Sequence, residues 1–383
     1  MAYHSRRVLF VGTLALGIGA GLYYGWHATQ RAPALSTLPD GFDWVATLES
    51  IPDEGFQRPS GSWRLNLPLD HGAHPGMRTE TWVLGAHLRT AEGESVGIQL
   101  ALARVALVPP DAPKRESAWA TREVYRGHMV LVTEAQRRGA GEERFSRAAL
   151  GLAGHDADEQ RVWLDDWSLR YGKGEHRDQI RVEARLDDTS VDIVLTPGKS
   201  SMSVDEEEGR APFRGFALSR LTAEGFLQRP SGKHSVSGLA WLDHMWGEIP
   251  LPIGPVVWDR VQLHLDDGSD VSMVRTRRRD GRGNATARGY RIDAQGEVER
   301  FEAAVTDMTP TRASQHQRDA TRYPLYWRLR ARDLDLEIEP LVEDQAYDFS
   351  ASVWSGVVVA HGRSRGRPVS GMGYLELTGY ENP

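Results

Sequence analysis

The sequence predicts an all-β protein made of two consecutive antiparallel β-barrel units that follow an N-terminal hydrophobic helix. Three observations support this prediction. Apolar and polar residues alternate with period two through most of the chain, turn signals separate these runs at hairpin-like intervals, and landmarks of the first half recur in the second. The 383 residues also exceed what one ordinary core accommodates, which indicates two domains.

The first 34 residues are expected to direct the chain to a membrane and to take no part in the β-structure. After the basic leader MAYHSRR, an uncharged apolar run extends from Val8 to Trp26. That run is about as long as the roughly 20 residues of a bilayer-spanning helix. The leader arginines favour the cytoplasmic side, so we expect a single-pass anchor in the cytoplasmic membrane with the body in the periplasm or outside. The small residues of Ala32-Pro33-Ala34 also fit a signal cleavage site, and cleavage would give a secreted protein.

Composition excludes several classes of function. The formal net charge of −7 and the isoelectric point near 6.0 argue against a nucleic-acid partner. The absence of cysteine rules out disulfides, thiolate nucleophiles and zinc–thiolate sites. The sequence has no nucleophile elbow, phosphate-binding loop or dinucleotide fingerprint. The 12 tryptophans fit either core packing or the walls of a pocket for a large apolar ligand.

Four runs show the alternation most clearly, and we predict half-buried strands there. They are ETWVLGAHL (80–88), SVGIQLALAR (95–104), RVQLHLDDG (260–268) and DLDLEIE (333–339). Turn signals such as AEG, DDG and RDGRG separate strands of this kind. One short helix is predicted, near EERFSRAALGLAG at residues 142–154.

The two halves share landmarks, which indicates two copies of one β-barrel unit. In both halves an Asp-His pair precedes a tryptophan and then a His-Leu pair before a glycine turn. These are Asp70-His71, Trp82 and His87-Leu88 in the first half, and Asp243-His244, Trp258 and His264-Leu265 in the second. We therefore expect one domain over residues 35–225 and another over residues 226–383.

Strand parity places charged side chains on faces that are otherwise apolar. We expect four of them to point inward, because each shares the parity of the apolar residues in its own strand: Glu80, Arg104, Asp243 and Asp259. One interpretation is a buried structural ion-pair network, for example between Glu80 and Arg104. The other is a polar cluster at the base of an apolar cavity, where a desolvated carboxylic acid has a raised pKa and can donate a proton.

The histidines lead to narrower expectations. His71 and His74 have a metal-like spacing, but a glycine and a proline make their segment a loop and no third ligand is evident. We therefore expect no metal site. His244 has the opposite parity to Asp243, and fits either a packed histidine bonded to backbone or a catalytic group.

Several motifs resemble those of the carotenoid 1,2-hydratase-like, or AttH-type (hydroxyneurosporene synthase), family. They are LPLDHGAHPGMRTETWVLGAHLRTAEGESVGIQLALAR, DDWSL, VSGLAWLDHMWGE, VVWDRVQLHLDDG, YPLYWRL and GMGYLELTGY, in the family's order from about residue 55 to the C-terminus. The resemblance implies two lipocalin-like (calycin) β-barrels. It also implies a cofactor-free hydro-lyase that hydrates the terminal C=C bond of an isoprenoid.

In that reaction, the resemblance implies that Asp243 protonates the alkene and that His244 or a second carboxylate accepts the proton of the added water. Aromatic faces would shield the carbocation. The expected ligand-binding residues are Glu80, Trp82, Arg104, Trp241, Trp246, Trp258 and Asp259. The alternative is a non-catalytic carrier of a lipid or hydrophobic metabolite, or an accessory protein of an ABC transporter, because a lipocalin-like shell can hold a ligand without reacting with it.

Overall fold

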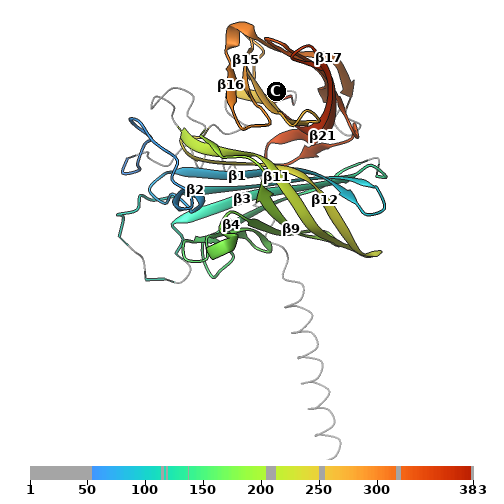
Figure 1. Ribbon diagram of the computed structural model, residues 1–383. Helices are drawn as coiled ribbons and strands as arrows, with labels where there is room; N and C mark the ends of the chain where they lie inside the picture. Colours follow the sequence, from blue (N-terminus) through green and yellow to red (C-terminus); the bar gives the residue numbers. More distant parts are fainter. Residues whose placement is uncertain are drawn as a thin grey trace, which may run out of the picture. The chain divides into compact units, whose positions relative to one another are not determined.

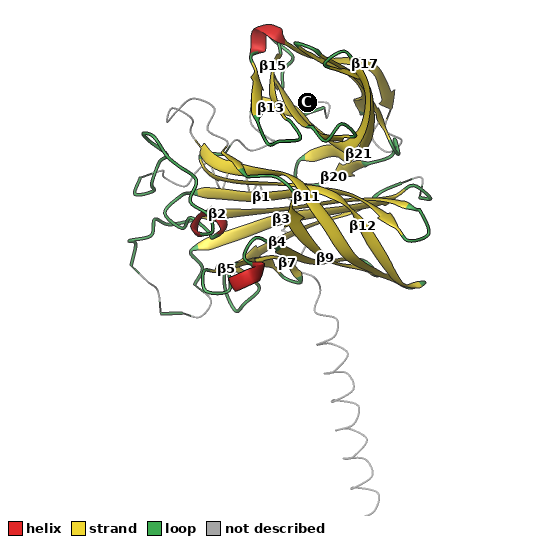
Figure 2. Cartoon of the chain, in the orientation of Figure 1, coloured by secondary structure: helices red, strands yellow, loops and turns green. Residues whose placement is uncertain are grey.

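The computed structural model describes residues 54–113, 116–117, 120–136, 138–203, 213–249, 255–315 and 321–380. Over these ranges the chain consists almost entirely of antiparallel strands and their turns, as Figure 2 shows. Its helical segments there are short 3₁₀ turns at η1 (Leu69–His71), η2 (Gly174–His176) and η3 (Ala303–Val305). The prediction of an all-β protein is confirmed.

The first sheet has 12 strands within the described residues, in the order β4-β3-β2-β1-β12-β11-β9-β8-β7-β6-β5 with β10 beside β11. They are β1 (Thr79–Thr90), β2 (Ser95–Ala106), β3 (Glu123–Thr133), β4 (Ala140–Arg147), β5 (Ala153–Asp156), β6 (Arg161–Leu164), β7 (Trp167–Tyr171), β8 (Ile180–Leu186), β9 (Thr189–Pro197), β10 (Met202–Ser203), β11 (Phe213–Arg229) and β12 (Gly232–Gly247). The first strand pairs with the last, so the sheet is curled and its two edges, β4 and β5, are neighbours along the chain.

The second sheet repeats this plan with 10 described strands, in the order β16-β15-β14-β13-β22-β21-β19-β18-β17 with β20 beside β21. They are β13 (Val256–Leu265), β14 (Asp270–Arg278), β15 (Thr286–Ile292), β16 (Val298–Phe301), β17 (Thr306–Gln315), β18 (Arg322–Ala331), β19 (Leu334–Pro340), β20 (Ala346–Asp348), β21 (Ser352–Ser364) and β22 (Arg367–Thr378). Its first and last strands again pair, and Figure 1 shows β15, β17 and β21 on a strongly curved sheet. The predicted pair of lipocalin-like, nearly closed barrels is confirmed.

Each curled sheet encloses its own apolar core. In the first, Leu84 of β1 stands opposite Leu100 of β2 and Leu242 of β12, and all three are fully buried. In the second, Val261 and Leu263 of β13 belong to a separate buried cluster. The four runs predicted from alternation correspond to β1, β2, β13 and β19, because period two sends every second side chain into the core.

The predicted helix at residues 142–154 is wrong. This segment is the end of β4, a turn and the start of β5. Leu150 and Gly151 have φ angles of 56° and 75°, which an α-helix cannot contain. β4 pairs in register with β3, so sheet pairing overrides the local preference of this segment for helix.

The chain passes from the first sheet to the second later than the expected division at residues 225 and 226. That position falls inside β11, and β12 then returns through the first sheet to pair with β1. The Asp-His pair in β12 thus belongs to the first sheet, whereas the His-Leu pair ends β13, the first strand of the second sheet.

The predicted N-terminal helix lies outside the described residues. Among the residues that are described, no helix is long and apolar enough to cross a membrane.

The outer faces of the two sheets contact each other through buried polar side chains. The recurring histidines meet there, with Nε2 of His87 3.0 Å from Nδ1 of His264. Nearby, the side-chain amide of Gln99 donates to Glu376 at 2.9 Å. Both faces of β1 and β13 are therefore covered, one by the core of its own sheet and the other by the neighbouring sheet.

Candidate functional site

Glu80 is the centre of a buried polar cluster inside the first sheet. Its Oε1 lies 2.8 Å from Nδ1 of His74 and 2.8 Å from Nε2 of His244. Its Oε2 accepts a bond from Nε of Arg104 at 3.2 Å and one from the backbone N–H of His74 at 2.9 Å. Glu80, His244 and Arg104 have 0% exposure, so the cluster is shielded from water on most sides.

Strand register explains why these residues meet. In the β1–β2 pair Glu80 stands opposite Arg104, and in the β1–β12 pair it stands opposite Trp246, with His244 two residues along on the same face. His74 comes from the loop between η1 and β1. The sequence-based expectation of an inward-facing Glu80–Arg104 ion pair is confirmed.

Aromatic rings hold both imidazoles in place. The Trp246 ring stacks on His74 with centroids 3.6 Å apart, and the Trp82 ring stacks on His244 at 4.7 Å. Phe216 contacts His244 edge-on at 5.3 Å. Trp82 thus lies on the inner face of the first sheet, as strand parity predicted, whereas Trp246 lies there although parity had assigned the inner face of its strand to Asp243.

Electrostatics keep Glu80 ionised. Burial raises the pKa of its carboxyl, but hydrogen bonds from His244 and His74 and the charge of Arg104 outweigh burial and hold the pKa well below its usual range. Burial lowers the pKa of His244, although its bond to Glu80 offsets part of that effect. Glu80 is therefore an orienting carboxylate rather than a proton donor.

His71 connects the cluster to an open cavity. It lines a pocket of about 480 Å³ together with Leu67, Asp178, Lys199 and Leu218, among others. Its ring stacks on Tyr171 at 4.2 Å and approaches Phe216, which in turn contacts His244. Burial, aided by the neighbouring His244, lowers the pKa of His71 to about 4. A ligand in this pocket would lie one aromatic layer away from the cluster.

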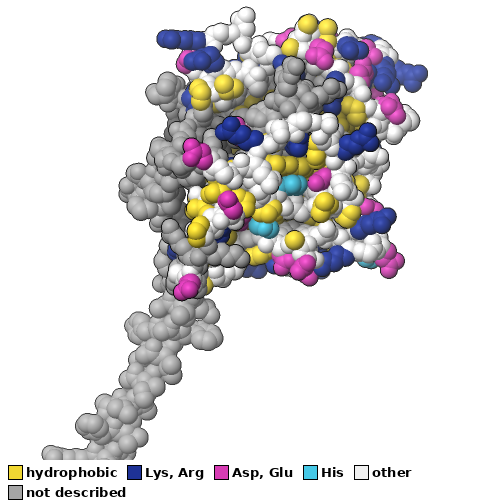
Figure 3. All heavy atoms as spheres, turned by 90° about the vertical axis from the view of Figure 1, so that its left-hand side faces the viewer, with side chains coloured by type: hydrophobic (Ala, Val, Ile, Leu, Met, Phe, Trp, Pro, Cys, Tyr) yellow, Lys and Arg dark blue, Asp and Glu magenta, His cyan; other side chains and the backbone are white. Residues whose placement is uncertain are grey.

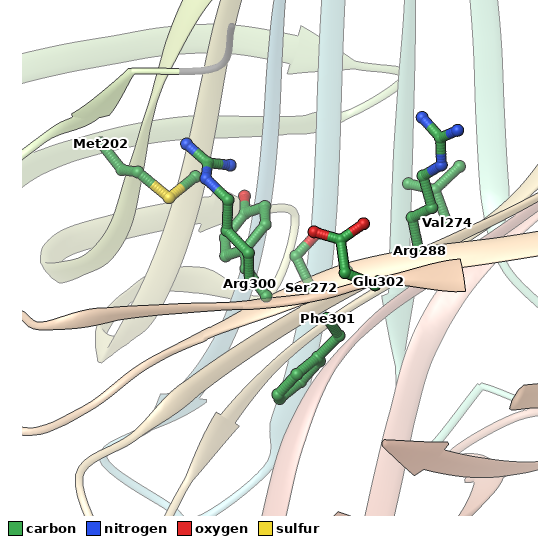
Figure 4. A pocket seen from close by; sticks show the side chains of 9 residues that line it. Met202, Ser272, Val274, Arg288, Arg300, Phe301 and Glu302 are labelled. Atoms are coloured by element: carbon green, nitrogen blue, oxygen red, sulfur yellow. The ribbon is translucent and has the colours of Figure 1, made fainter. Parts of the chain in front are cut away.

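Another, smaller cavity of about 110 Å³ lies at the second sheet and is shown in Figure 4. Met202, Arg300, Glu302 and Phe301 contribute to its lining, and the ring of Phe301 points to the opposite side of the ribbon, toward the second core. Its lining includes none of the predicted site residues.

Asp243 lies on the opposite side of β12 from His244, on the outer face that contacts the second sheet. Its carboxylate accepts bonds from Nε1 of Trp241 at 2.8 Å, the amide of Gln262 at 2.8 Å and the guanidinium of Arg260 at 2.9 Å. Burial raises the pKa of Asp243, and the charge of Arg260 opposes that rise. Asp243 and Trp241 share a face of β12, as their parity predicted. That face is not the barrel interior, so the prediction that Asp243 points inward is wrong. Asp243 and His244 therefore do not form one site.

The last two expected ligand-binding residues, Trp258 and Asp259, also lie outside the interior of the first sheet. Trp258 donates from Nε1 to Glu376 at 2.9 Å on the outer face of β13. Asp259 is inside the second sheet, where Arg275 bonds it at 2.7 Å. The predicted site residues therefore fall into three places, of which only the first-sheet interior brings several together.

Sequence reasoning did not recognise His74 as a partner of Glu80 and His244. The spacing of His71 and His74 drew attention to this loop, but His244, which completes the group with His74 and Glu80, lies far along the chain. In the structure the ring nitrogens of His74 and His244 and an oxygen of Glu80 lie within 4.8 Å of one another, a set that could hold a metal ion. Phe216 and Tyr171 gave no distinguishing signal, because core aromatics have the same pattern.

No curated protein sequence matches the chain. Among solved structures, the chain resembles an AttH protein from Nitrosomonas europaea, with 27% identity, a TM-score of 0.73 and coverage of 85% of this chain and 100% of that one. It shares its fold with kievitone hydratase from Nectria haematococca, at 16% identity and a TM-score of 0.60, over 85% of this chain and 98% of that one. The AttH-like family model matches residues 58–380, and the chain therefore belongs to the AttH-like family.

Proposed function

We propose that the first sheet binds a long apolar molecule, isoprenoid or lipid-like, and that His244, oriented by Glu80, transfers the proton when water adds to a C=C bond of that molecule. The aromatic surroundings of the cluster support an apolar ligand. The name of the structural neighbour kievitone hydratase supports hydration as the class of reaction.

One observation carries the catalytic part of the proposal. Nε2 of His244 bonds Glu80, whereas its Nδ1 is buried and has no hydrogen-bond partner. Buried polar atoms are normally satisfied, so an orphaned imidazole nitrogen on a ring that is surrounded by Trp82, Phe216 and Trp246 calls for an explanation. With its proton on Nε2, held by the carboxylate, the ring presents a lone pair on Nδ1, as a general base does.

The reaction balances with this single group. Nδ1 takes a proton from water as the oxygen bonds one alkene carbon, and the imidazolium then returns that proton to the other carbon. Such base-initiated addition suits a C=C bond conjugated to a carbonyl, which can hold the developing negative charge. It differs from the acid-first hydration that the family resemblance implied, because Asp243, the expected acid, is bonded to Arg260 outside this interior.

Farnesal tests both mechanisms, because it carries a conjugated and several isolated C=C bonds on one isoprenoid chain. Incubation with the full-length protein in heavy-oxygen water should give product labelled at the conjugated bond, located by mass spectrometry. His244→Asn should remove this product, whereas His128→Asn, a buried histidine bonded to Gln99 outside the cluster, should retain it. Equal turnover by both folded variants, or no labelled product from the parent protein, would refute the catalytic proposal.

The second candidate is a carrier that holds a lipid or hydrophobic metabolite for an ABC transporter. The hydrogen bonds of Glu80 favour this candidate, because both of its carboxylate oxygens already accept bonds from protein donors. A fully bonded cluster can close an apolar site without reacting. Parinaric acid, a fluorescent polyene fatty acid, would then bind with unchanged affinity to His244→Asn, and no chemical change would occur in any ligand.

We further propose that residues 8–26 hold the body on the outer face of the cytoplasmic membrane, since the leader arginines favour that orientation. A reporter that is active only in the cytoplasm, fused after Pro383, should stay silent. Strong signal from it would defeat this orientation.

A further inference from the structure

The grouping of His74, Glu80 and His244 has the composition of a metal centre. The three side chains come from separate segments, a loop, β1 and β12, and offer Nδ1, a carboxylate oxygen and Nε2 within 4.8 Å of one another. Two imidazoles and a carboxylate are a common ligand set for zinc, and leave a coordination position open. Metal–ligand distances of about 2 Å would place these atoms about 3.3 Å apart, so the present 2.8 Å contacts need to open only slightly.

The surroundings fix the three ligands in the way that metal sites require. Nε2 of His74, the nitrogen that would face away from the ion, lies 3.5 Å from Oδ1 of Asp70, so a carboxylate stands behind this ligand. Arg104 holds Oε2 of Glu80, the oxygen that does not contact the two imidazole rings. Stacked indole rings lock both imidazoles, as described above, so little side-chain freedom remains to be lost on binding.

The local charge balance also favours a cation. Arg104 bonds two carboxylates, Glu80 at 3.2 Å and Glu123 at 2.9 Å, and Asp70 adds a third beside His74. Three carboxylates against one guanidinium leave two negative charges when the histidines are neutral. Buried uncompensated charge is costly, and a divalent ion would neutralise it.

We propose that this cluster binds one divalent transition-metal ion of the zinc class through Nδ1 of His74, an oxygen of Glu80 and Nε2 of His244. His74 has a side chain 20% exposed and provides the route by which the ion reaches the buried partners. Binding at Nε2 moves the proton of His244 to Nδ1 and removes the free lone pair there. The ion therefore competes with the proton transfer proposed above and would act as an inhibitor of it.

Metal binding is measured without any activity assay, so its outcome is independent of the proposed reaction. The full-length protein, stripped with chelator, is titrated with Co²⁺ and with Zn²⁺, followed by visible absorption and by calorimetry. We expect close to one equivalent of each ion, with cobalt d–d bands in the intensity range of a four- or five-coordinate site. A rise in melting temperature with zinc concentration should accompany binding, because the ion binds only the folded chain.

Variants decide whether this cluster is the site. His74→Ala should lose the cobalt bands, and Asp70→Asn should weaken affinity by about 10- to 100-fold as a carboxylate behind a ligand does. His361→Ala, which removes an exposed histidine of the second sheet, serves as the control and should bind normally. Because His74 is partly exposed, its variant should fold, which circular dichroism can check. Cobalt bands that persist in folded His74→Ala, or the absence of any histidine-dependent binding in the parent, would overturn the proposal.

Discussion

At Asp243, three donors from two sheets converge on one carboxylate, and this arrangement changes the role of the residue. The sequence offered two interpretations, a functional acid or half of a structural ion pair. The structure favours the second, because Arg260 lies 2.9 Å from Asp243 and neither side chain is more than 14% exposed. The same short stretch of β12 thus serves two purposes, with Asp243 joining the sheets and His244 lining the interior of the first.

Asp243→Asn should therefore destabilise the fold rather than only impair chemistry. Removal of one partner of a buried ion pair leaves the other charge uncompensated, which costs roughly 3–5 kcal/mol. The carboxylate of Glu376, 3.7 Å from Arg260, still compensates part of that charge, so we expect a loss of stability near the lower end of that range. Urea unfolding measures it, with Asp158→Asn at an exposed position as the control. If the two variants are equally stable, the ion pair contributes little and our interpretation of Asp243 fails.

The limits of prediction at the residue scale follow from burial on both sides of a strand. Alternation correctly placed Glu80 and Arg104 inside, because it identifies the residues that share a face. It could not say which face of β12 points into its own barrel, since Asp243 at 6% exposure and His244 at 0% are both buried. A strand covered on both faces gives no polar side to orient it. Only the register with β1 settles the matter.

At the scale of elements, the hairpins β1–β2 and β13–β14 occupy the same position in their sheets, and their outer histidines meet at His87 and His264. The recurring His-Leu pairs predicted this equivalence, because the leucine of each pair enters its core while the histidine faces the other sheet. The recurring Asp-His pairs did not predict this equivalence, because the second pair, Asp243-His244, lies in β12 of the first sheet. Likewise the predicted helix at residues 142–154 failed because pairing with the preceding strand, β3, decides the structure there.

The contact between these hairpins makes stability depend on pH. Burial is the main cause that lowers the pKa of His87 and of His264 to about 3 each, from 6.5. The unfolded chain therefore binds more protons than the native protein between these values, and stability should fall as pH decreases from about 6.5 to about 3. Each histidine contributes a slope of up to about 1.4 kcal/mol per pH unit.

His87→Gln should reduce that slope by up to about 1.4 kcal/mol per pH unit, because one titrating group is removed. The glutamine can still make a polar contact to His264. Unfolding free energies measured in urea at several pH values give the slope directly. His361→Gln, at an exposed position, should leave it unchanged. An unaltered slope in His87→Gln would mean that this histidine is already protonated in the native protein.

In the whole molecule, two sheets of like topology enclose different groups of side chains. The first encloses the cluster around Glu80, whereas the second encloses Asp259 bonded to Arg275 and an apolar core. Among the described residues on the face shown in Figure 3, acidic and basic side chains are interspersed. Composition and motif order predicted this two-part architecture, but the functional difference between the parts depends on contacts between distant segments.

We propose that an apolar ligand binds in the interior of the first sheet, around Trp82, Trp246 and Phe216. Photo-crosslinking tests it most directly, with an isoprenoid or fatty acid that carries a diazirine on its chain and peptide mapping of the labelled protein. We predict labels on peptides that contain Trp82 or Trp246, and their loss when unlabelled parinaric acid competes. Labels confined to the core of the second sheet, around Trp327 and Phe301, would contradict the account.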